Sequence, residues 1–327
     1  MRPPLRAWHD RDLGHVTLGS EKIGILGYGS QGRAHALNLR DGGTAIEIGL
    51  PLGSASRARA ETDGFAVSTP GEVTARADIV MVLAPDELQS RLFAADIAPN
   101  LRPGAALAFA HGFAVHHRQI VAPAGVDVIM AAPMGAGPLV RREFERGHGV
   151  PCLVAVHADA TGRAQARALA YAKALGGGKA GILETTFSEE TETDLFAEQT
   201  VLCGGVSSLI TQAFETLVEA GYPAELAYFS CLHELKFTVD LIHERGIAGM
   251  RSRISNTAKY GDLTRGPRVL GEGAKNRMQA ILQEIQSGAF GAEWIAETAA
   301  GRKELDRMMA ETAAHPIEEV GARLRRP

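Results

Sequence analysis

The chain has 327 residues, of which 45% are hydrophobic and 22% charged, and its formal net charge is −4. This length suggests two domains or one large one, and the composition is that of a soluble globular protein. No lysine and arginine tract is long enough for a nucleic-acid-binding surface, and no stretch reads as a membrane span. Three cysteines, without paired or metal-site spacing, favour a reducing compartment. We therefore expect a cytoplasmic protein that binds neither nucleic acid nor membrane.

A glycine-rich turn between a strand and a helix is the first informative motif. Residues 22–27 are predicted to form a buried strand and residues 33–40 a helix. The turn between them has the pattern G-x-G-x-x-G and consists of Gly27, Tyr28, Gly29, Ser30, Gln31 and Gly32. Such glycines let the backbone approach a pyrophosphate, which the following helix N-terminus binds through its N–H groups. With a second strand at 44–48, this turn indicates dinucleotide binding and not an ordinary strand–helix turn.

The loop after the second strand predicts which dinucleotide is bound, because the end of this strand meets the adenine ribose. Ser54, Ser56 and Arg57 are suited to hold a 2′-phosphate through hydroxyl and guanidinium hydrogen bonds. Glu47 has the spacing of an acid that binds a free 2′-hydroxyl, but it is expected inside the strand. NADP(H) is therefore favoured, with NAD(H) as the alternative.

The rest of the chain divides into a strand-rich half and a helical half. Further strands are predicted at 78–84, 105–110, 127–132, 150–156 and 181–184, and helices at 85–89 and 161–175. From about Phe187 helical periodicity dominates, through residues 194–202, 209–220, 223–244, 275–288 and 302–314. We therefore predict an α/β Rossmann domain at residues 1–186, followed by an all-α domain at residues 187–327.

Two pairs of polar residues in the helical half are spaced four apart, so that each pair shares one face of a helix. Asp194 and Glu198 offer two carboxylates that can hold one hard cation. In the second pair, Ser230 and Glu234, one position is a neutral hydroxyl, which is a poor ligand for magnesium.

Three glutamates precede the first pair, at positions 189, 190 and 192. Acidic residues near the start of a helix are stabilised by the helix dipole. We interpret Glu189, Glu190 and Glu192 as a solvated helix N-terminus, in which Glu192 is the residue best placed to face a metal.

The chain resembles the ketol-acid reductoisomerase (acetohydroxyacid isomeroreductase) family in its short, class I form. The resemblance covers roughly residues 20–310 and lies in segments 27–32, 111–113, 139–142, 184–187, 189–199, 231–236, 254–257 and 260–267. It implies a Rossmann domain followed by a deeply knotted helical domain, in a homodimer whose active sites are shared between subunits. It also implies NADPH, two magnesium ions and a small 2-hydroxy-2-alkyl-3-keto acid substrate. In this family the alkyl group migrates first, and hydride transfer then reduces the resulting 2-keto acid.

Several residues match functional positions of this family. His111 matches the histidine treated as catalytic, and Ser255 matches the serine that meets the substrate carboxylate. Asp194 and Glu198 match acids of the first metal, and Glu234 matches an acid of the second. The matches to cofactor contacts are Tyr28, Gly29, Ser30, Gln31, Ser54, Ser56, Asp86, Gln89 and Gly137.

Three departures from the family pattern fall on the chemistry. Ser230 stands where the family has a metal-binding glutamate, and Met134 stands where it has a lysine close to the substrate. Pro51 replaces an arginine that grips the 2′-phosphate, with Arg57 as the nearby substitute. These losses predict a diverged paralogue that keeps the cofactor and magnesium at one site. Such a paralogue would reduce or oxidise a substrate other than acetolactate, without two-metal alkyl migration, in specialised metabolism.

Two alternatives remain at this point. The first is a true ketol-acid reductoisomerase of branched-chain amino-acid biosynthesis, which compensates for the missing ligands. The second is a non-catalytic nucleotide-binding paralogue. The retained His111, Asp194 and Glu198 argue against this second alternative, because a pure binding protein has no physical need for them.

Overall fold

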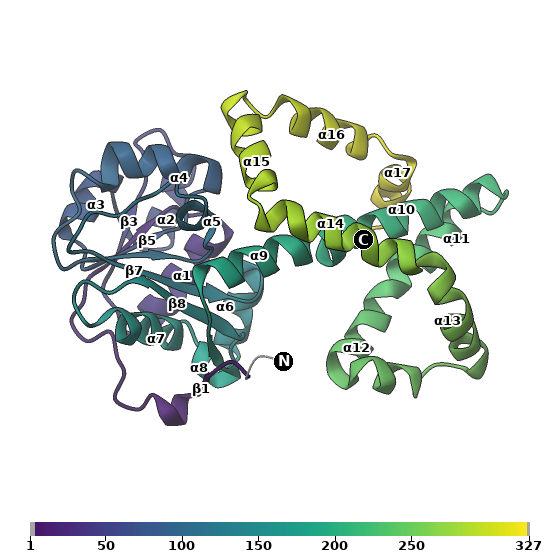
Figure 1. The fold of residues 1–327 in the computed structure, drawn as a ribbon, viewed down its shortest axis with the longest axis horizontal. Helices are drawn as coiled ribbons and strands as arrows, with labels where there is room; N and C mark the ends of the chain where they lie inside the picture. The colour runs from purple at the N-terminus through teal and green to yellow at the C-terminus, as the bar shows by residue number, and fades with distance from the viewer. Residues whose placement is uncertain (1–3, 326–327) are drawn as a thin grey trace. The chain divides into compact units, whose positions relative to one another are not determined.

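The structure is a computed structural model that describes residues 4–325. The chain divides into two compact units, Met1–Thr191 and Glu192–Pro327. The first unit contains a nine-stranded sheet with helices, and the second is built from helices (Figure 1). This confirms the predicted α/β domain followed by an all-α domain, while the knot stays a prediction. The division falls inside α9 (Phe187–Ala197), slightly beyond the boundary predicted after residue 186.

The sheet of the first unit has the strand order of a Rossmann fold, with an extension at one edge. Its strands are β1 (Ala7–Trp8), β2 (Ile23–Leu26), β3 (Ile46–Gly49), β4 (Ala66–Ser68), β5 (Ile79–Val82), β6 (Ala106–Phe109), β7 (Asp127–Pro133), β8 (Cys152–Ala158) and β9 (Ile182–Glu184). Their order is β1-β9-β8-β7-β6-β5-β2-β3-β4. The strands from β4 to β7 are parallel, and β8 is antiparallel to β7. The chain reverses its direction of winding between β2 and β5, which is where sheets of this kind bind ligands.

Helices connect these strands and cover the sheet. They are α1 (Ser30–Asp41), α2 (Arg57–Thr62), α3 (Pro70–Arg76), α4 (Asp86–Leu92), α5 (Phe113–His116), α6 (Gly137–Glu145), α7 (Ala164–Ala174) and α8 (Gly177–Ala180), with short helical turns η1 (Asp10–Asp12) and η2 (Phe93–Ile97). Helix α1 begins one turn earlier than predicted, directly after Gly29. Helix α3 was not predicted, although Thr69, Pro70 and Glu72 form a capping box with proline at the first position.

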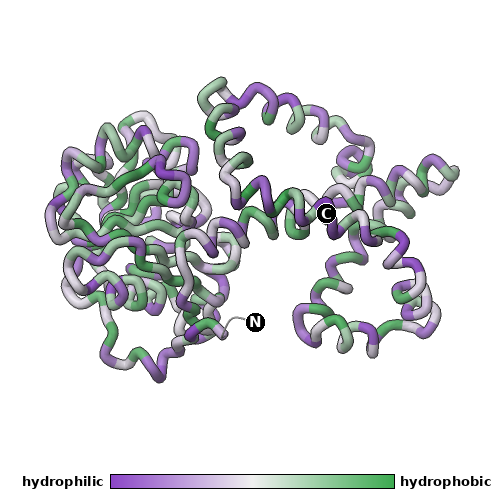
Figure 2. Tube along the Cα trace, in the orientation of Figure 1, coloured by the Kyte–Doolittle hydropathy of each residue, from purple (hydrophilic) through white to green (hydrophobic). Residues whose placement is uncertain are grey.

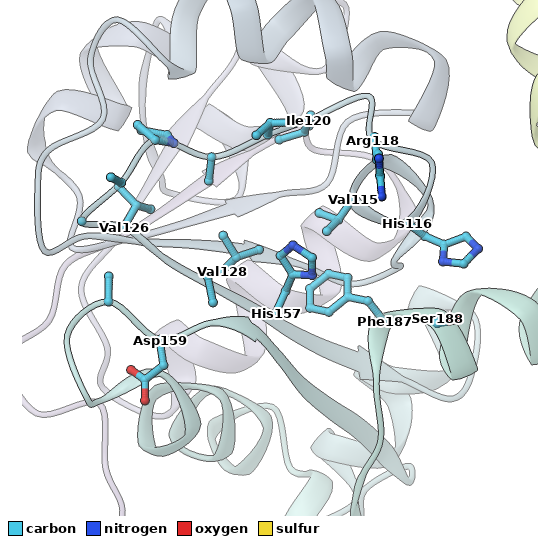
Figure 3. A pocket seen from close by; sticks show the side chains of 17 residues that line it. Val115, His116, Arg118, Ile120, Val126, Val128, His157, Asp159, Phe187 and Ser188 are labelled. Atoms are coloured by element: carbon cyan, nitrogen blue, oxygen red, sulfur yellow. The ribbon is translucent and has the colours of Figure 1, made fainter.

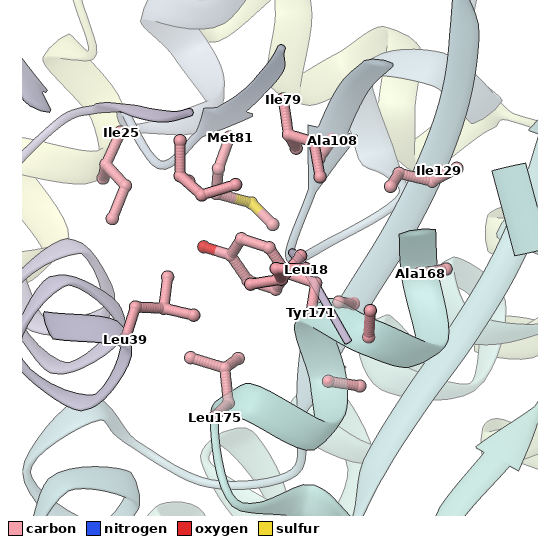
Figure 4. Packing of buried hydrophobic residues seen from close by; sticks show 14 of the residues in the cluster. Leu18, Ile25, Leu39, Ile79, Met81, Ala108, Ile129, Ala168, Tyr171 and Leu175 are labelled. Carbon is pink, nitrogen blue, oxygen red and sulfur yellow. The ribbon is translucent and has the colours of Figure 1, made fainter. Parts of the chain in front are cut away.

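Apolar side chains pack on both faces of the sheet to form the core of the first unit. Tyr171 of α7 lies at the centre of one cluster, among Ile25, Leu39 and Met81 (Figure 4). Its hydroxyl is 3.2 Å from Nδ1 of His35, which is fully buried. Burial lowers the pKa of His35 to about 3, because the charged imidazolium cannot be hydrated there. This histidine is therefore a neutral part of the core.

A buried ion pair ties α7 to the sheet. Arg167 is 5% exposed and its Nη1 lies 2.8 Å from Oδ2 of Asp127, whose side chain is fully buried. Asp127 also accepts hydrogen bonds from the backbone N–H and the hydroxyl of Thr161. A second carboxylate, that of Glu21, lies 2.8 Å from Nε of Arg167. The charges of this network are thus paired as well as buried, as such groups must be.

The second unit consists of a series of helices with a small core of its own. They are η3 (Glu198–Leu202), α10 (Gly204–Glu219), α11 (Ala224–Tyr228), η4 (Phe229–His233), α12 (Glu234–Arg251), α13 (Asn256–Val269), α14 (Glu272–Gln286), α15 (Ala289–Ala299), α16 (Lys303–Ala313) and α17 (Pro316–Leu324). Helices α13, α15 and α17 were not predicted. Phe214, Tyr228, Ile317 and Val320 form a buried cluster. Hydrophobic residues nevertheless recur along all these helices (Figure 2).

One helical run is long and apolar enough to cross a membrane by length and composition alone. This run, Phe187–Glu219, has only 6% of its most apolar window buried. The expectation that the chain contains no such stretch was therefore wrong. The run begins with the acidic residues of α9, and the apolar residues that make it long enough follow in α10. Exposed apolar surfaces of this extent usually mark sites where a protein interacts with another molecule.

Candidate active site

The glycine-rich turn has the geometry of a phosphate-binding loop. Gly27 has φ +116°, and a Cβ atom at this position would lie 2.5 Å from the carbonyl oxygen of Leu83. A Cβ atom on Gly32 would lie 2.3 Å from the carbonyl oxygen of Gly27. Both positions therefore require glycine. Because α1 begins at Ser30, the second half of the turn is also the first turn of the helix. An anion can therefore accept hydrogen bonds from the first N–H groups of α1.

Within this loop the side chain of Tyr28 is buried and packs against Phe65. Its hydroxyl donates to Oδ2 of Asp63 at 2.8 Å, and Arg33 donates twice to the same carboxylate, at 2.7 and 3.0 Å. Hydrogen bonds from Arg33 in particular lower the pKa of Asp63 to about 2, while burial raises the pKa of Tyr28. The Tyr28 side chain therefore holds the loop against the core through Phe65 and Asp63. Only the backbone of Tyr28 is left to contact a phosphate.

Two glutamine amides lie on either side of the point where the strand order reverses. Gln31 follows β2, and its Nε2 donates to the carbonyl oxygen of Gly135 at 2.8 Å. Gln89 follows β5, and its Nε2 donates to the carbonyl oxygen of Ala84 and to Asp86. Within residues 4–325, the buried Oε1 atoms of both glutamines lack a hydrogen-bond partner. Buried polar atoms are normally paired, so these two oxygens indicate that a polar ligand belongs here.

Gly137 closes the other side of this region. A Cβ atom at Gly137 would lie 2.1 Å from the carbonyl oxygen of Ser30, so the start of α6 packs directly against the start of α1. The tight turn, the unpaired amide oxygens and this close contact fit a nicotinamide dinucleotide lying across the carboxyl ends of β2 and β5.

The loop between β3 and α2 holds the residues predicted to meet the nucleotide ribose. The Ser54 hydroxyl accepts a hydrogen bond from the N–H of Ser56 at 3.3 Å. The Arg57 guanidinium donates to the carbonyl oxygens of Leu50 and Val67, at 2.9 and 3.2 Å. Arg57 thus joins the ends of β3 and β4. Glu47 lies inside β3, as expected, where its carboxylate is paired with Arg76.

A buried glutamate positions His111, which follows β6. Nδ1 of His111 lies 2.9 Å from Oε1 of Glu190, and Oε2 of Glu190 accepts the N–H of Gly112 at 2.8 Å. Glu190 is only 4% exposed, so its interpretation as part of a solvated helix N-terminus was wrong. The spacing contained the missed signal. Glu190 precedes Asp194 by four residues and therefore lies on the same face of α9 as the predicted metal ligands.

The two acids of the predicted metal site are next to each other along this face. Asp194 lies in α9, and Glu198 is the first residue of η3, which has π-helical geometry. Glu192, predicted to face a metal, accepts a hydrogen bond from Gln286 at 3.2 Å. The two carboxylates, one helical turn apart and exposed, fit the oxygen ligands that magnesium prefers.

The remaining predicted residues lie in the second unit. Ser230 is inside η4, which like η2 and η3 has π-helical geometry, and Glu234 begins α12 directly after it. Such turns are frequent at functional sites, and here one accompanies each of the two polar pairs. Ser255 caps α13, where its hydroxyl accepts the N–H of Ala258 at 3.1 Å.

A separate cavity of about 860 Å³ opens beside β7 and β8 (Figure 3). Val128, His157 and Phe187 line it together with the loop that carries Arg118 and Ile120. None of the predicted catalytic, cofactor or metal residues is among its lining residues. This cavity is therefore not part of the candidate active site.

Both units of the chain match families of known proteins. Residues 17–181 match the family described as acetohydroxy acid isomeroreductase, NADPH-binding domain, and residues 187–327 match the ketol-acid reductoisomerase C-terminal domain. The chain is 57% identical to a ketol-acid reductoisomerase (NADP(+)) of Saccharopolyspora erythraea over 316 residues, which is 97% of this chain and 95% of that protein.

Solved structures give a consistent result. An NADH-preferring ketol-acid reductoisomerase from an uncultured archaean has 42% identity and a TM-score of 0.96, covering 98% of both chains. A semialdehyde dehydrogenase NAD-binding protein from Cupriavidus necator has 19% identity and a TM-score of 0.61, covering 82% of this chain and 99% of its own. The second similarity concerns the fold alone.

These comparisons correct the expectation of a paralogue that lacks alkyl migration and acts on a substrate other than acetolactate. Identity of 57%, extending over both units, supports the alternative reading instead. The expectation gave too much weight to Ser230, Met134 and Pro51. Each of these positions changes one ligand or one charge, whereas the identity extends over 97% of this chain.

Proposed function

The chain belongs to the ketol-acid reductoisomerase family, and we propose that it catalyses the complete reaction of that family. It is an NAD(P)-dependent oxidoreductase. In the proposed reaction, a 2-hydroxy-2-alkyl-3-keto acid such as 2-acetolactate undergoes alkyl migration, and a hydride from NADPH then reduces the product. The observation that carries this proposal is the identity with a ketol-acid reductoisomerase (NADP(+)) over nearly the full length of both chains.

The residues at the carboxyl ends of β2 and β5 are proposed to bind NADPH. The turn from Gly27 to Gly32 would hold the pyrophosphate, and Gln31 and Gln89 would offer their unpaired amide oxygens to the cofactor. Gly137 would lie on the nicotinamide side, where the absence of a side chain lets the start of α6 pack against Ser30. Ser54 and Ser56 would meet the adenosine ribose.

His111 is proposed to move the proton that the reaction exchanges. With Nδ1–H donated to Glu190, the ring presents Nε2 on its opposite side as the atom that accepts or returns a proton. Because Glu190 also binds the N–H of Gly112, the ring and the end of β6 are held by one carboxylate. Glu190 is thus a positioning residue, and Ser255 is proposed to bind the substrate carboxylate.

Asp194, Glu198 and Glu234 are proposed to hold magnesium, at one site that includes the first two. Bound magnesium would supply Lewis-acid polarisation of the substrate oxygens. The fit rests on the carboxylate chemistry of Asp194 and Glu198 and on their spacing of one helical turn. Ser230 adds a neutral hydroxyl and no charge to this set.

We further propose that the protein is a cytoplasmic homodimer in which the second units of two copies cover each other. Most exposed large apolar side chains among the described residues lie in this unit, including Phe237 and Leu263. Their burial by a second copy explains the exposed apolar run Phe187–Glu219 without a membrane. Ser255 and Glu234 lie in the same unit, so the active site would combine residues of both copies.

The decisive experiment measures NADPH oxidation with magnesium and either 2-acetolactate or the already migrated 3-hydroxy-3-methyl-2-oxobutanoate. The proposal expects turnover of both compounds, because migration precedes reduction. Turnover of the migrated acid alone would mean that reduction occurs without migration, and the proposal would be wrong. A Glu190→Gln variant assayed in parallel ties any activity to this site.

A further inference from the structure

The loop that should recognise the cofactor's 2′-phosphate has an unusual shortage of available positive charge. Pro51 and Leu52 follow directly after β3, and the side chain of Leu52 is 78% exposed. No charged residue occurs between Gly49 and Arg57. A phosphate held by Ser54 and Ser56 alone would receive hydroxyl hydrogen bonds, but no cation would balance its charge and no guanidinium would bind it through two N–H groups.

Arg57 is already engaged elsewhere. Its guanidinium donates to the carbonyl oxygens of Leu50 and Val67, so both of its terminal nitrogens hold the backbone at the ends of β3 and β4. To turn toward a phosphate it would have to leave two partly buried carbonyl groups without their donor, which costs free energy. Arg57 therefore shapes the loop and does not supply its charge.

Arg59, in the first turn of α2, is differently placed. It lines a cavity of about 670 Å³ together with Gly29 and Ser30 of the phosphate loop. It also lines a neighbouring cavity of about 550 Å³ with Arg33 and Asp63. Arg59 thus lies beside the phosphate loop, and in the chain it follows the β3–α2 loop by a few residues. In this type of fold the adenosine ribose lies near these two segments.

The other arginines of these cavities have carboxylate partners. Arg33 binds Asp63 through two nitrogens, and Arg141 binds Asp41 at 2.7 Å and Glu145 at 2.9 Å. Arg142 pairs with Glu143 at 3.3 Å. Within residues 4–325, Arg59 alone among them has a side chain without a hydrogen bond or ion pair, and only its backbone carbonyl accepts one, from the N–H of Asp63. The exposed guanidinium of Arg59 is the available cation at this edge of the cofactor region.

We propose that Arg59 binds the 2′-phosphate of NADP(H) and sets the preference of this chain for NADP(H) over NAD(H). The inference rests on the proposed cofactor site but not on the proposed reaction. Because one exposed and flexible side chain provides the charge, the preference is modest, on the order of tenfold, and falls with rising salt concentration. NADH is then a usable second cofactor.

The test measures binding of 2′,5′-ADP and 5′-AMP to the full-length protein by calorimetry, in wild type and in Arg59→Ala. These probes differ only in the 2′-phosphate, and their binding requires no turnover. We expect wild type to bind 2′,5′-ADP about tenfold more tightly. The Arg59→Ala variant should lose this difference with an unchanged affinity for 5′-AMP, and Arg59→Lys should restore part of it.

An equal change of charge far from the site, Arg163→Ala, serves as the matched control and should keep the difference. A preference for 2′,5′-ADP that persists in Arg59→Ala would overturn the inference, as would its absence from wild type. Failure of the acetolactate assay would contradict the proposed reaction only, because the nucleotide measurement does not depend on it.

Discussion

The two units of the chain differ in how much of their apolar surface is buried within the unit. In the first unit, strands β2, β5 and β6 are buried along their entire length, and two clusters cover both faces of the sheet. In the second unit the helices leave large side chains such as Phe237, Leu263 and Leu270 more than half exposed. The first unit thus contains its own core. The second leaves exposed the kind of side chains that elsewhere form a core.

Charged groups follow the same division. The first unit buries a complete ion pair between Arg167 and Asp127, whereas pairs of the second unit, such as Arg307 with Glu304, are exposed. Exposed pairs contribute little to stability, while a buried pair becomes costly when one partner is removed. The comparison therefore predicts that stability of the first unit depends on internal contacts, and that of the second on association.

Removal of Arg167 tests the first half of this comparison. An Arg167→Met variant leaves the carboxylate of Asp127 buried without its partner, which should lower the free energy of unfolding by about 3–5 kcal/mol. Denaturant titration of the first unit's transition measures the loss. The matched control is Arg102→Met, whose exposed pair with Asp78 should contribute less than about 1 kcal/mol. Equal effects of both variants would contradict the assignment of a buried network.

A charge on the exposed face of the second unit tests the other half. Phe237→Asp should weaken self-association by about 2 kcal/mol or more, roughly 30-fold in Kd, because it would desolvate a carboxylate in the interface. Sedimentation over a range of protein concentrations measures this change. Val121→Asp places the same charge on an exposed apolar position of the first unit and should leave association unchanged. A wild-type protein that is monomeric and active at micromolar concentration would refute the proposed dimer.

Glu190 holds His111 within the first unit, to which both residues belong. Glu190→Gln keeps the shape but removes the charge opposite Nδ1, and kcat should fall by about 10–100-fold with unchanged NADPH affinity. The pH profile of kcat should shift to lower pH, since the imidazolium loses its stabilising carboxylate. Glu189→Gln is the neighbouring control. A fall in kcat without a change of profile would indicate a structural role only.

The smallest expected effect concerns His35 in the core of the first unit. Its pKa is lowered to about 3 by burial, so the folded state requires the neutral ring, while the unfolded chain binds a proton near pH 6.5. Stability is therefore fully present above pH 6.5 and is lost as pH falls toward 3. Between pH 7 and 5.5 the loss should be about 1 kcal/mol.

Denaturant titrations at these two pH values, in wild type and His35→Gln, isolate this contribution from that of the carboxylates, which stay ionised in this range. The variant should lose that part of the pH dependence, whereas His148→Gln, at an exposed position, should retain it. An unchanged pH dependence in His35→Gln would show that the ring does not titrate in this way.

Much of the architecture could be predicted because it depends on short-range patterns. Apolar runs bounded by glycine predicted most strands, and the turn from Gly27 to Gly32 predicted the dinucleotide site, since tight bends and close backbone contact require glycine. The helical period predicted the second, all-helical domain, with a boundary a few residues before the division that the structure shows after Thr191. The short α3 was missed although its capping residues were visible, because seven residues contain too little periodicity.

The reaction was mispredicted because a few single residues were given more weight than the chain as a whole. Ser230, Met134 and Pro51 were weighed one at a time, and each loss of a ligand or charge is real. Resemblance over the whole chain was the stronger observation, because it covers both units, whereas each departure concerns a single residue.

By itself, the sequence determined most of the strands, the order of the two domains, the dinucleotide turn and the family. Only the tertiary structure decided which charged side chains are already bound to other groups of the protein. Glu190 lies 79 residues from His111 in the chain, yet its carboxylate is buried against the imidazole, and Arg57 is bound to two carbonyl groups while Arg59 is not. Local patterns specify how a segment folds, but the partner of a polar side chain is set by contacts between segments that only the folded chain brings together.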